Sequence, residues 1–218
     1  MSRLSTVLAI DTAHTNYSIA IIKSNAVLSE FSIIDDEKPS EKIIELVDKA
    51  LLQANIGLHN LDGVVVGVGP GNFTGIRVGI SAAKGIAFAL NIKCLGINRF
   101  QNLIIDESPT LGIIKIKEDL FYTQMFIKEK PISDPIEQNL LKILNTQYSK
   151  NTIISGDHAL RISQKLNLKC GKKTSISDAS EIGFLGIKHS DSKELLPSPF
   201  YVKGPDAKLP TEPAPKLL

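Results

Sequence analysis

The sequence predicts an α/β protein in which a mixed β-sheet carries helices on both faces and a reduced second lobe follows. Three short apolar runs come first, within residues 1–34. An amphipathic helix follows, and then an unbroken apolar run, a second helix and a further apolar run. The resulting order, βββαβαβ, combines an antiparallel meander with two parallel crossovers.

The meander is predicted from the first three apolar runs. Val7–Ile10 is short and closed by Asp11-Thr12, as expected of a buried strand. Tyr17–Ile22 and Ala26–Ile34 flank the polar turn Lys23-Ser24-Asn25, which predicts a hairpin.

Pro39–Ala54 predicts the first helix. Proline suits a first helical turn because its missing N–H would be unbonded there. One face is apolar, the opposite face is charged, and Gly57 ends the pattern. The helix should therefore lie on the sheet.

Gly63–Val68 has no polar alternation, which predicts a central parallel strand buried on both faces. Gly69-Pro70-Gly71-Asn72 then turns the chain into a long helix, Phe73–Leu90, before a strand at Ile92–Ile97. A glycine turn before a helix N-terminus presents unpaired N–H groups, so it either holds phosphate or serves packing. No Gly-Lys-Ser/Thr follows, so the turn is not a Walker A loop.

The helix Phe73–Leu90 is apolar on nearly every side, because only Arg77, Ser81 and Lys84 form a narrow polar stripe. A helix covering one sheet face would leave a broad polar side. It therefore meets either a partner helix or the second half of its own chain. Each glycine inside a helix lowers helix stability by about 1 kcal/mol relative to alanine, so we expect the glycines of this helix to have a packing or functional role. The residues predicted to form a partner interface are Gly75, Ile76, Gly79, Ala82, Ala83 and Ile86.

The second half carries weaker signals. Leu111–Ile116 and Leu120–Ile127 predict a hairpin, Asn151–Ser155 a strand and Glu181–Lys188 a short helix. The last stretch is rich in proline. We expect an N-terminal lobe at 1–103, a smaller C-terminal lobe at 104–200 and an extended proline-rich tail at 201–218.

Composition excludes several classes of protein. An apolar content of 43% with 22% charged residues is typical of a globular chain, and a net charge of +2 argues against a stand-alone nucleic-acid binder. Cys94 and Cys170 fit neither a disulfide framework nor a metal motif. No apolar run approaches the roughly 18–20 residues that span a bilayer. We expect a cytoplasmic protein with no membrane partner.

Three sequence blocks resemble a known family. Val7–Ala13 (VLAIDTA) resembles the first strand of the actin-like ATPase superfamily. Val66–Ala89, containing GVGPGNFTGIRVGISAAKGIAFA, is similar to the signature of the TsaB family, also called YeaZ. Tyr201–Ala207 resembles the ending of that family. The resemblance is strong over 5–103 and returns at 197–207.

The resemblance implies an actin-like (RNase H-like) fold and a non-catalytic scaffold or activating subunit. Such a subunit serves the complex that forms N6-threonylcarbamoyladenosine at position 37 of tRNA. It implies a catalytic partner, TsaD, which is a paralogue, an ATPase partner, TsaE, and a homodimer in isolation. Contact with tRNA would come only through the complex, and ATP or ADP would bind at a complex interface.

The resemblance also says which chemistry to look for. TsaD carries a His-x-x-x-His metal pair, and Arg99 and Leu103 stand at those positions here, so we expect neither a metal site nor a catalytic residue. The loop after the first strand lacks the glycine of actin-like kinases. Asp11 therefore either turns the chain or contacts metal and phosphate. The candidate nucleotide-binding residues are Asp11, Thr12, Gly69, Gly71 and Thr74. The alternative function is an actin-like small-molecule kinase or ATPase, which needs a second phosphate loop and a full second lobe.

Overall fold

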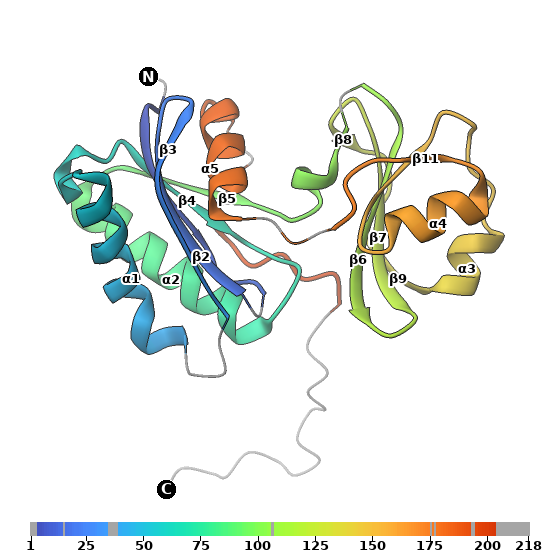
Figure 1. Ribbon diagram of the computed structural model, residues 1–218, viewed down its shortest axis with the longest axis horizontal. Coiled ribbons are helices and arrows are strands. Elements are labelled where there is room, and N and C mark those ends of the chain that lie inside the picture. Colours follow the sequence, from blue (N-terminus) through green and yellow to red (C-terminus); the bar gives the residue numbers. More distant parts are fainter. Residues whose placement is uncertain are drawn as a thin grey trace, which may run out of the picture.

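The computed structural model describes residues 4–14, 16–34, 39–105, 107–174, 176, 178–192 and 195–203. These residues form two lobes side by side, each built on its own β-sheet (Figure 1). The predicted proline-rich tail lies outside the described residues from position 204 onward.

The first sheet has the strand order β3-β2-β1-β4-β5. Its strands are β1 (Thr6–Asp11), β2 (Asn16–Lys23), β3 (Ala26–Ile34), β4 (Gly63–Gly67) and β5 (Lys93–Ile97). β1, β2 and β3 form an antiparallel meander, whereas β4 pairs in parallel with β1 and β5. The predicted mixed sheet is therefore confirmed.

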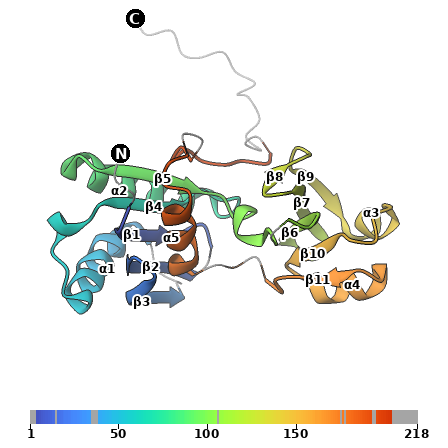
Figure 2. The same cartoon turned by 90° about the horizontal axis from the view of Figure 1, so that it is seen from above.

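Helices cover both faces of this sheet, as predicted. α1 (Pro39–Ala54) and α2 (Phe73–Leu90) pack on the outer face, and α5 (Ala179–Lys188) packs on the face toward the second lobe (Figures 1 and 2). A Cβ on Gly183 would overlap the side chain of Ile22, so glycine lets α5 approach β2 closely. The strands β1 and β4 are buried along their whole length and need cover on both sides.

α5 thus packs within the first lobe although it lies in the range 104–200. The covering helix for the inner face comes from late in the chain because α1 and α2, which follow the meander, both occupy the outer face.

The second sheet has the order β11-β10-β6-β7-β8, and β9 pairs with β7. Two helices, α3 (Leu140–Asn145) and α4 (Ala159–Leu166), lie on its outer side (Figure 1). The strands are β6 (Thr110–Lys117), β7 (Leu120–Ile127), β8 (Lys130–Pro131), β9 (Ile136–Asn139), β10 (Ile153–Gly156) and β11 (Lys169–Cys170). Two 3-10 turns complete the described elements, η1 (Leu58–Asn60) and η2 (Gln101–Leu103).

A hydrogen-bond network ties the two lobes together at η2. The Nζ of Lys172 donates to the Oδ1 of Asn102 at 2.9 Å and to the Oε1 of Glu181 at 3.0 Å. The Nδ2 of Asn102 donates to the Oε2 of Glu181 at 2.7 Å. Three segments of the chain, around positions 102, 172 and 181, therefore meet at one point.

α2 is long and apolar enough to cross a membrane by length and composition. In the structure it packs against β4, α1 and the neighbouring strands β1 and β5. Part of its apolar surface is therefore buried in the core of the first lobe.

Candidate functional site

The loop after β1 folds back onto the glycine turn. The Oδ1 of Asp11 accepts a hydrogen bond from the N–H of Ala13 at 2.9 Å, so this carboxylate turns the chain. The hydroxyl of Thr12 donates to the carbonyl oxygen of Gly75 at 2.7 Å. A Cβ on Gly71 would overlap the carbonyl of Ala13. The backbone of the first loop thus fills the space beside the turn.

The N-terminus of α2 is capped by its own chain. The side chain of Asn72 accepts from the N–H of Gly75 at 2.8 Å, and the N–H of Asn72 donates to the carbonyl oxygen of Ala13 at 2.8 Å. An N-cap of this kind satisfies one of the orphan donors that would otherwise face a ligand.

The structure buries some of the candidate nucleotide-binding residues and leaves others exposed. Asp11 and Thr12 are each 1% exposed, and a Cβ on Gly69 would overlap Ile76. Gly71 is exposed at the mouth of a cavity, and Thr74 lies on the open surface of α2.

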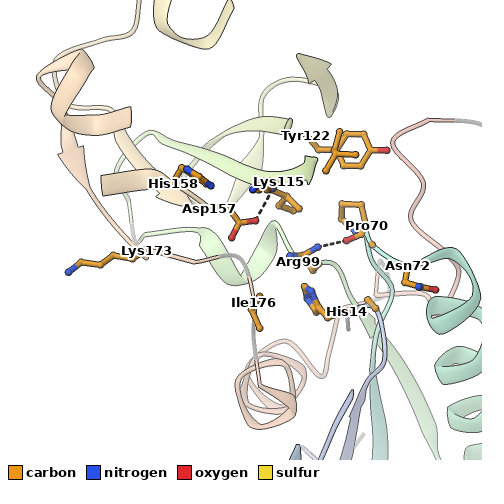
Figure 3. Close-up of a pocket in the computed structure, with 14 residues that line it drawn as sticks. His14, Pro70, Asn72, Arg99, Lys115, Tyr122, Asp157, His158, Lys173 and Ile176 are labelled. Carbon is orange, nitrogen blue, oxygen red and sulfur yellow. Dashed lines mark hydrogen bonds between the residues drawn. The ribbon is translucent and has the colours of Figure 1, made fainter. Parts of the chain in front are cut away.

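That cavity lies between the lobes and has a volume of about 690 Å³. Figure 3 shows side chains of both lobes around it. The first lobe contributes Ala13, His14, Pro70, Gly71, Asn72 and Arg99, and the second contributes Ile114, Lys115, Ile116, Tyr122, Asp157, His158, Lys173 and Ile176.

Arg99 forms the floor of the cavity on the side of the first lobe. It is 6% exposed, and its Nη1 donates to the carbonyl oxygen of Pro70 at 2.8 Å. Burial lowers the pKa of Arg99 to about 10, against the opposing effect of the carboxylates of Asp11 and Asp157. The guanidinium therefore stays charged at neutral pH and holds the turn before α2 in place.

His14 lies beside Arg99. Burial, and then the nearby charge of Arg99, lower the pKa of His14 to about 3, so the imidazole is neutral at physiological pH. Its Nε2 is buried and has no hydrogen-bond partner among the described residues.

Across the cavity, the second lobe contributes a turn, at Gly156 and Asp157, that was not among the predicted site residues. β10 ends at Gly156, whose φ of 115° requires glycine, and Asp157 follows. The Oδ2 of Asp157 accepts from the N–H of Lys115 at 2.8 Å. The sequence pattern that could have identified this turn is Ile153–Leu160 (IISGDHAL), an apolar strand followed by glycine, an acidic residue and the start of a helix.

α2 presents two different faces, and the predicted interface residues lie mostly on the inner one. Gly75, Ile76, Gly79 and Ala83 are buried in the first lobe. A Cβ on Gly79 would overlap the Oγ1 of Thr12, so this glycine accommodates the first loop. Ala82 and Ile86 are half-buried against the same core. Gly75 and Gly79 thus serve packing against the first loop of the same chain.

The outer face of α2 forms an exposed band that we call the α2 stripe. Phe88 is 89% exposed, and Phe73 is 44% exposed at the start of the helix. Leu52 of the neighbouring α1 is 83% exposed. The α2 stripe comprises Phe73, Thr74, Arg77, Ser81, Lys84, Gly85 and Phe88. In the part of the chain that the structure describes, no group of three or more His, Cys, Asp or Glu side chains is placed to hold a metal ion.

The sequence is similar to proteins that take part in one tRNA modification. Residues 33–111 match the family TsaD, tRNA N6-adenosine threonylcarbamoyltransferase. The tRNA threonylcarbamoyladenosine biosynthesis protein TsaB of Bacillus subtilis is 30% identical over 109 residues, 50% of this chain and 48% of that protein. The TsaB protein of Buchnera aphidicola subsp. Schizaphis graminum is 25% identical over 206 residues, 88% of this chain and 91% of that protein.

Among solved structures, YeaZ from Pseudomonas aeruginosa covers 90% of this chain and 99% of its own, with a TM-score of 0.63 and 18% identity. The chain spans about half the length of several curated relatives that it matches, including the Bacillus protein and those of Mycobacterium.

Two sheet-based lobes, the first led by a meander and covered on both faces, define a protein of the actin-like ATPase (RNase H-like) fold. Several of the curated relatives, including those of Bacillus subtilis and Buchnera aphidicola, carry the TsaB name. The TsaB relatives, the YeaZ structures and the TsaD family match together support the TsaB (YeaZ) family for this chain.

Proposed function

We propose that this protein is a cytoplasmic, non-catalytic subunit in the biosynthesis of N6-threonylcarbamoyladenosine at position 37 of tRNA. It pairs with a TsaD-like catalytic subunit through the α2 stripe and the exposed side of α1, and it supports that subunit as a scaffold. A TsaE-like ATPase joins the complex, tRNA binds through the complex, and copies of the chain pair when TsaD is missing.

The observation that carries this proposal is the exposed apolar surface of α1 and α2. Phe88 and Leu52 stand almost fully in solvent, and Ile44 of α1 is 51% exposed. Clustered apolar side chains rimmed by polar residues mark protein–protein interfaces. Nothing lies within 4 Å of the position of a Cβ on Gly85, a residue of the α2 stripe, which leaves room for a close helix.

The match to TsaD supports the choice of partner. Residues 33–111 contain both helices, so the paralogue carries a corresponding helix pair. Two such surfaces pack face to face across a pseudo-two-fold axis, because each presents the same elements to the other. The same geometry accounts for self-pairing in isolation.

The residues at the positions of the TsaD histidines support a non-catalytic role. Arg99 is committed to the carbonyl oxygen of Pro70, and Leu103 is fully buried in a cluster with Phe100 and Phe126. Neither side chain suits a metal ion, so ATP or ADP in the complex is assigned to the interface with the partner and not to this chain alone.

Co-purification with the TsaD of the same organism tests the proposal. Phe88→Asp should abolish the complex, because it places a charge where the partner helix packs, and it should leave folding intact, because Phe88 contacts little of its own chain. Leu141→Asp is the matched control, since Leu141 is 70% exposed on α3 of the other lobe. Unchanged co-purification of the Phe88→Asp variant would contradict the proposed interface.

A further inference from the structure

The beginning of α2 and the segment after α5 meet in a three-residue cluster. The rings of Phe73 and Tyr201 are stacked with centroids 5.1 Å apart. The guanidinium carbon of Arg77 lies 3.8 Å from the centroid of Phe73, and its Nε donates to the hydroxyl oxygen of Tyr201 at 3.0 Å. The cluster joins residues that are 124 positions apart in sequence.

This cluster fixes Arg77 without neutralising it. One face of the guanidinium lies against the ring of Phe73, and one of its donors is taken by the phenol oxygen of Tyr201. The terminal Nη1 and Nη2 groups have no hydrogen-bond or ion-pair partner in the part of the chain that the structure describes. An exposed arginine normally loses rotamer freedom on binding, and the two aromatic contacts remove much of that cost in advance.

The charges on α2 favour a negatively charged group as the binding partner of Arg77. α2 contains no acidic residue, and its only charged side chains are Arg77 and Lys84. A planar guanidinium with two free terminal groups matches a carboxylate in bidentate geometry. Apolar exposed residues, above all Phe88, follow on the same stripe, which favours a folded protein surface over a nucleic acid backbone.

We propose that Arg77 is a pre-positioned receptor for an Asp or Glu carboxylate on the partner protein, and that Phe73 and Tyr201 are its positioning residues. This inference rests on the proposed function, because the partner surface is that of the TsaD-like subunit. Arginine and tyrosine are among the residue types that most often dominate the binding energy of an interface.

Calorimetric titration of the purified chain with its cognate TsaD tests the inference. Arg77→Gln should weaken binding by about thirtyfold or more, because it leaves a desolvated carboxylate unpaired. Arg77→Lys should recover little of this loss, since a lysine cannot make the bidentate pair. Tyr201→Phe keeps the stack but removes the hydroxyl, and it should weaken binding about fivefold. Raising the salt concentration should weaken the wild type more than Arg77→Gln.

Arg161→Gln is the matched control, because Arg161 is an exposed arginine on α4 of the other lobe. It should bind like the wild type, and all variants should share the wild-type midpoint of urea unfolding. Equal binding of wild type and Arg77→Gln overturns the inference while leaving the proposed function standing. A loss confined to the affinity of the isolated chain for tRNA overturns it in favour of an RNA contact. Failure of the wild-type chain to bind TsaD overturns both.

Discussion

The hydroxyl of Thr12 lies directly against Gly79, and only glycine, which has no Cβ, fits at position 79. The Oγ1 of Thr12 donates to the carbonyl oxygen of Gly75 one turn earlier, at 2.7 Å, and a Cβ on Gly79 would overlap that oxygen atom. The first loop of the chain and the glycine-rich helix are therefore one packing unit. The contact with Thr12 explains Gly75 and Gly79 of α2.

Gly79→Ala should destabilise the isolated protein by about 2 kcal/mol, because overpacking outweighs the better helix propensity of alanine. Thr12→Ala alone should lower the free energy of unfolding by about 1–2 kcal/mol, because the carbonyl of Gly75 loses the hydrogen bond from the Thr12 hydroxyl. The double variant should be less destabilised than the sum of the two, since removing the hydroxyl makes room for the added methyl group. Urea unfolding of all four proteins measures the coupling, and strict additivity would disprove the contact.

Gly85→Ala should have the opposite effect. Gly85 is in the same helix, but it is exposed and nothing lies within 4 Å of the position of its Cβ. Alanine should therefore raise the free energy of unfolding of the isolated chain by up to about 1 kcal/mol through helix propensity alone. A destabilised Gly85→Ala variant would mean that this face of α2 is covered within the monomer.

The stability of the protein should fall as the pH drops below about 6.5. The pKa of His14 is near 3 in the folded protein, so between pH 6.5 and 3 the unfolded chain takes up a proton that the folded chain does not. This side chain alone should cost about 2 kcal/mol of stability between pH 7 and pH 5. The urea midpoint of His14→Gln should therefore change less over this range than that of the wild type. Parallel curves for the two proteins would show that His14 is protonated as easily in the fold as in the unfolded chain.

Isolated protein should give no binding heat with Mg-ATP at micromolar concentrations. Asp11 already accepts from the backbone of Ala13, and Thr12 already donates to Gly75, so neither is placed to receive phosphate or its metal. Tight binding in the same titration would favour the kinase alternative, and Arg99→Gln would then show whether the nucleotide lies in the cavity between the lobes.

The first lobe follows from sequence patterns because each of its elements has a clear one. The helix bounds Pro39–Ala54 and Phe73–Leu90 agree with prediction, since Pro39 begins one and Asn72 caps the other. Strand Gly63–Gly67 ends one residue earlier than predicted. In the second lobe, α4 has only eight residues, too few for a reliable periodicity, and it was not predicted.

The orientation of α2 is the part that sequence alone does not determine. A helix with small residues on one side and apolar residues on the other offers two sides for the core. Gly79 and Ala83 face inward because the first loop, and not a partner, approaches them. The cavity residues Lys115 of β6 and Asp157, in the turn after β10, belong to the second lobe, and only the tertiary structure brings them to the same cavity as Arg99.

The position of α5 has a consequence for the order in which the protein is made. The strands β1, β2, β4 and β5 are all synthesised within the first 97 residues, yet the helix that covers their inner face spans 179–188. A nascent chain emerging from the ribosome therefore exposes a bare apolar sheet until more than 80 further residues have been translated. During that interval the sheet is a natural target for chaperones, and the second lobe is free to form before the first is sealed.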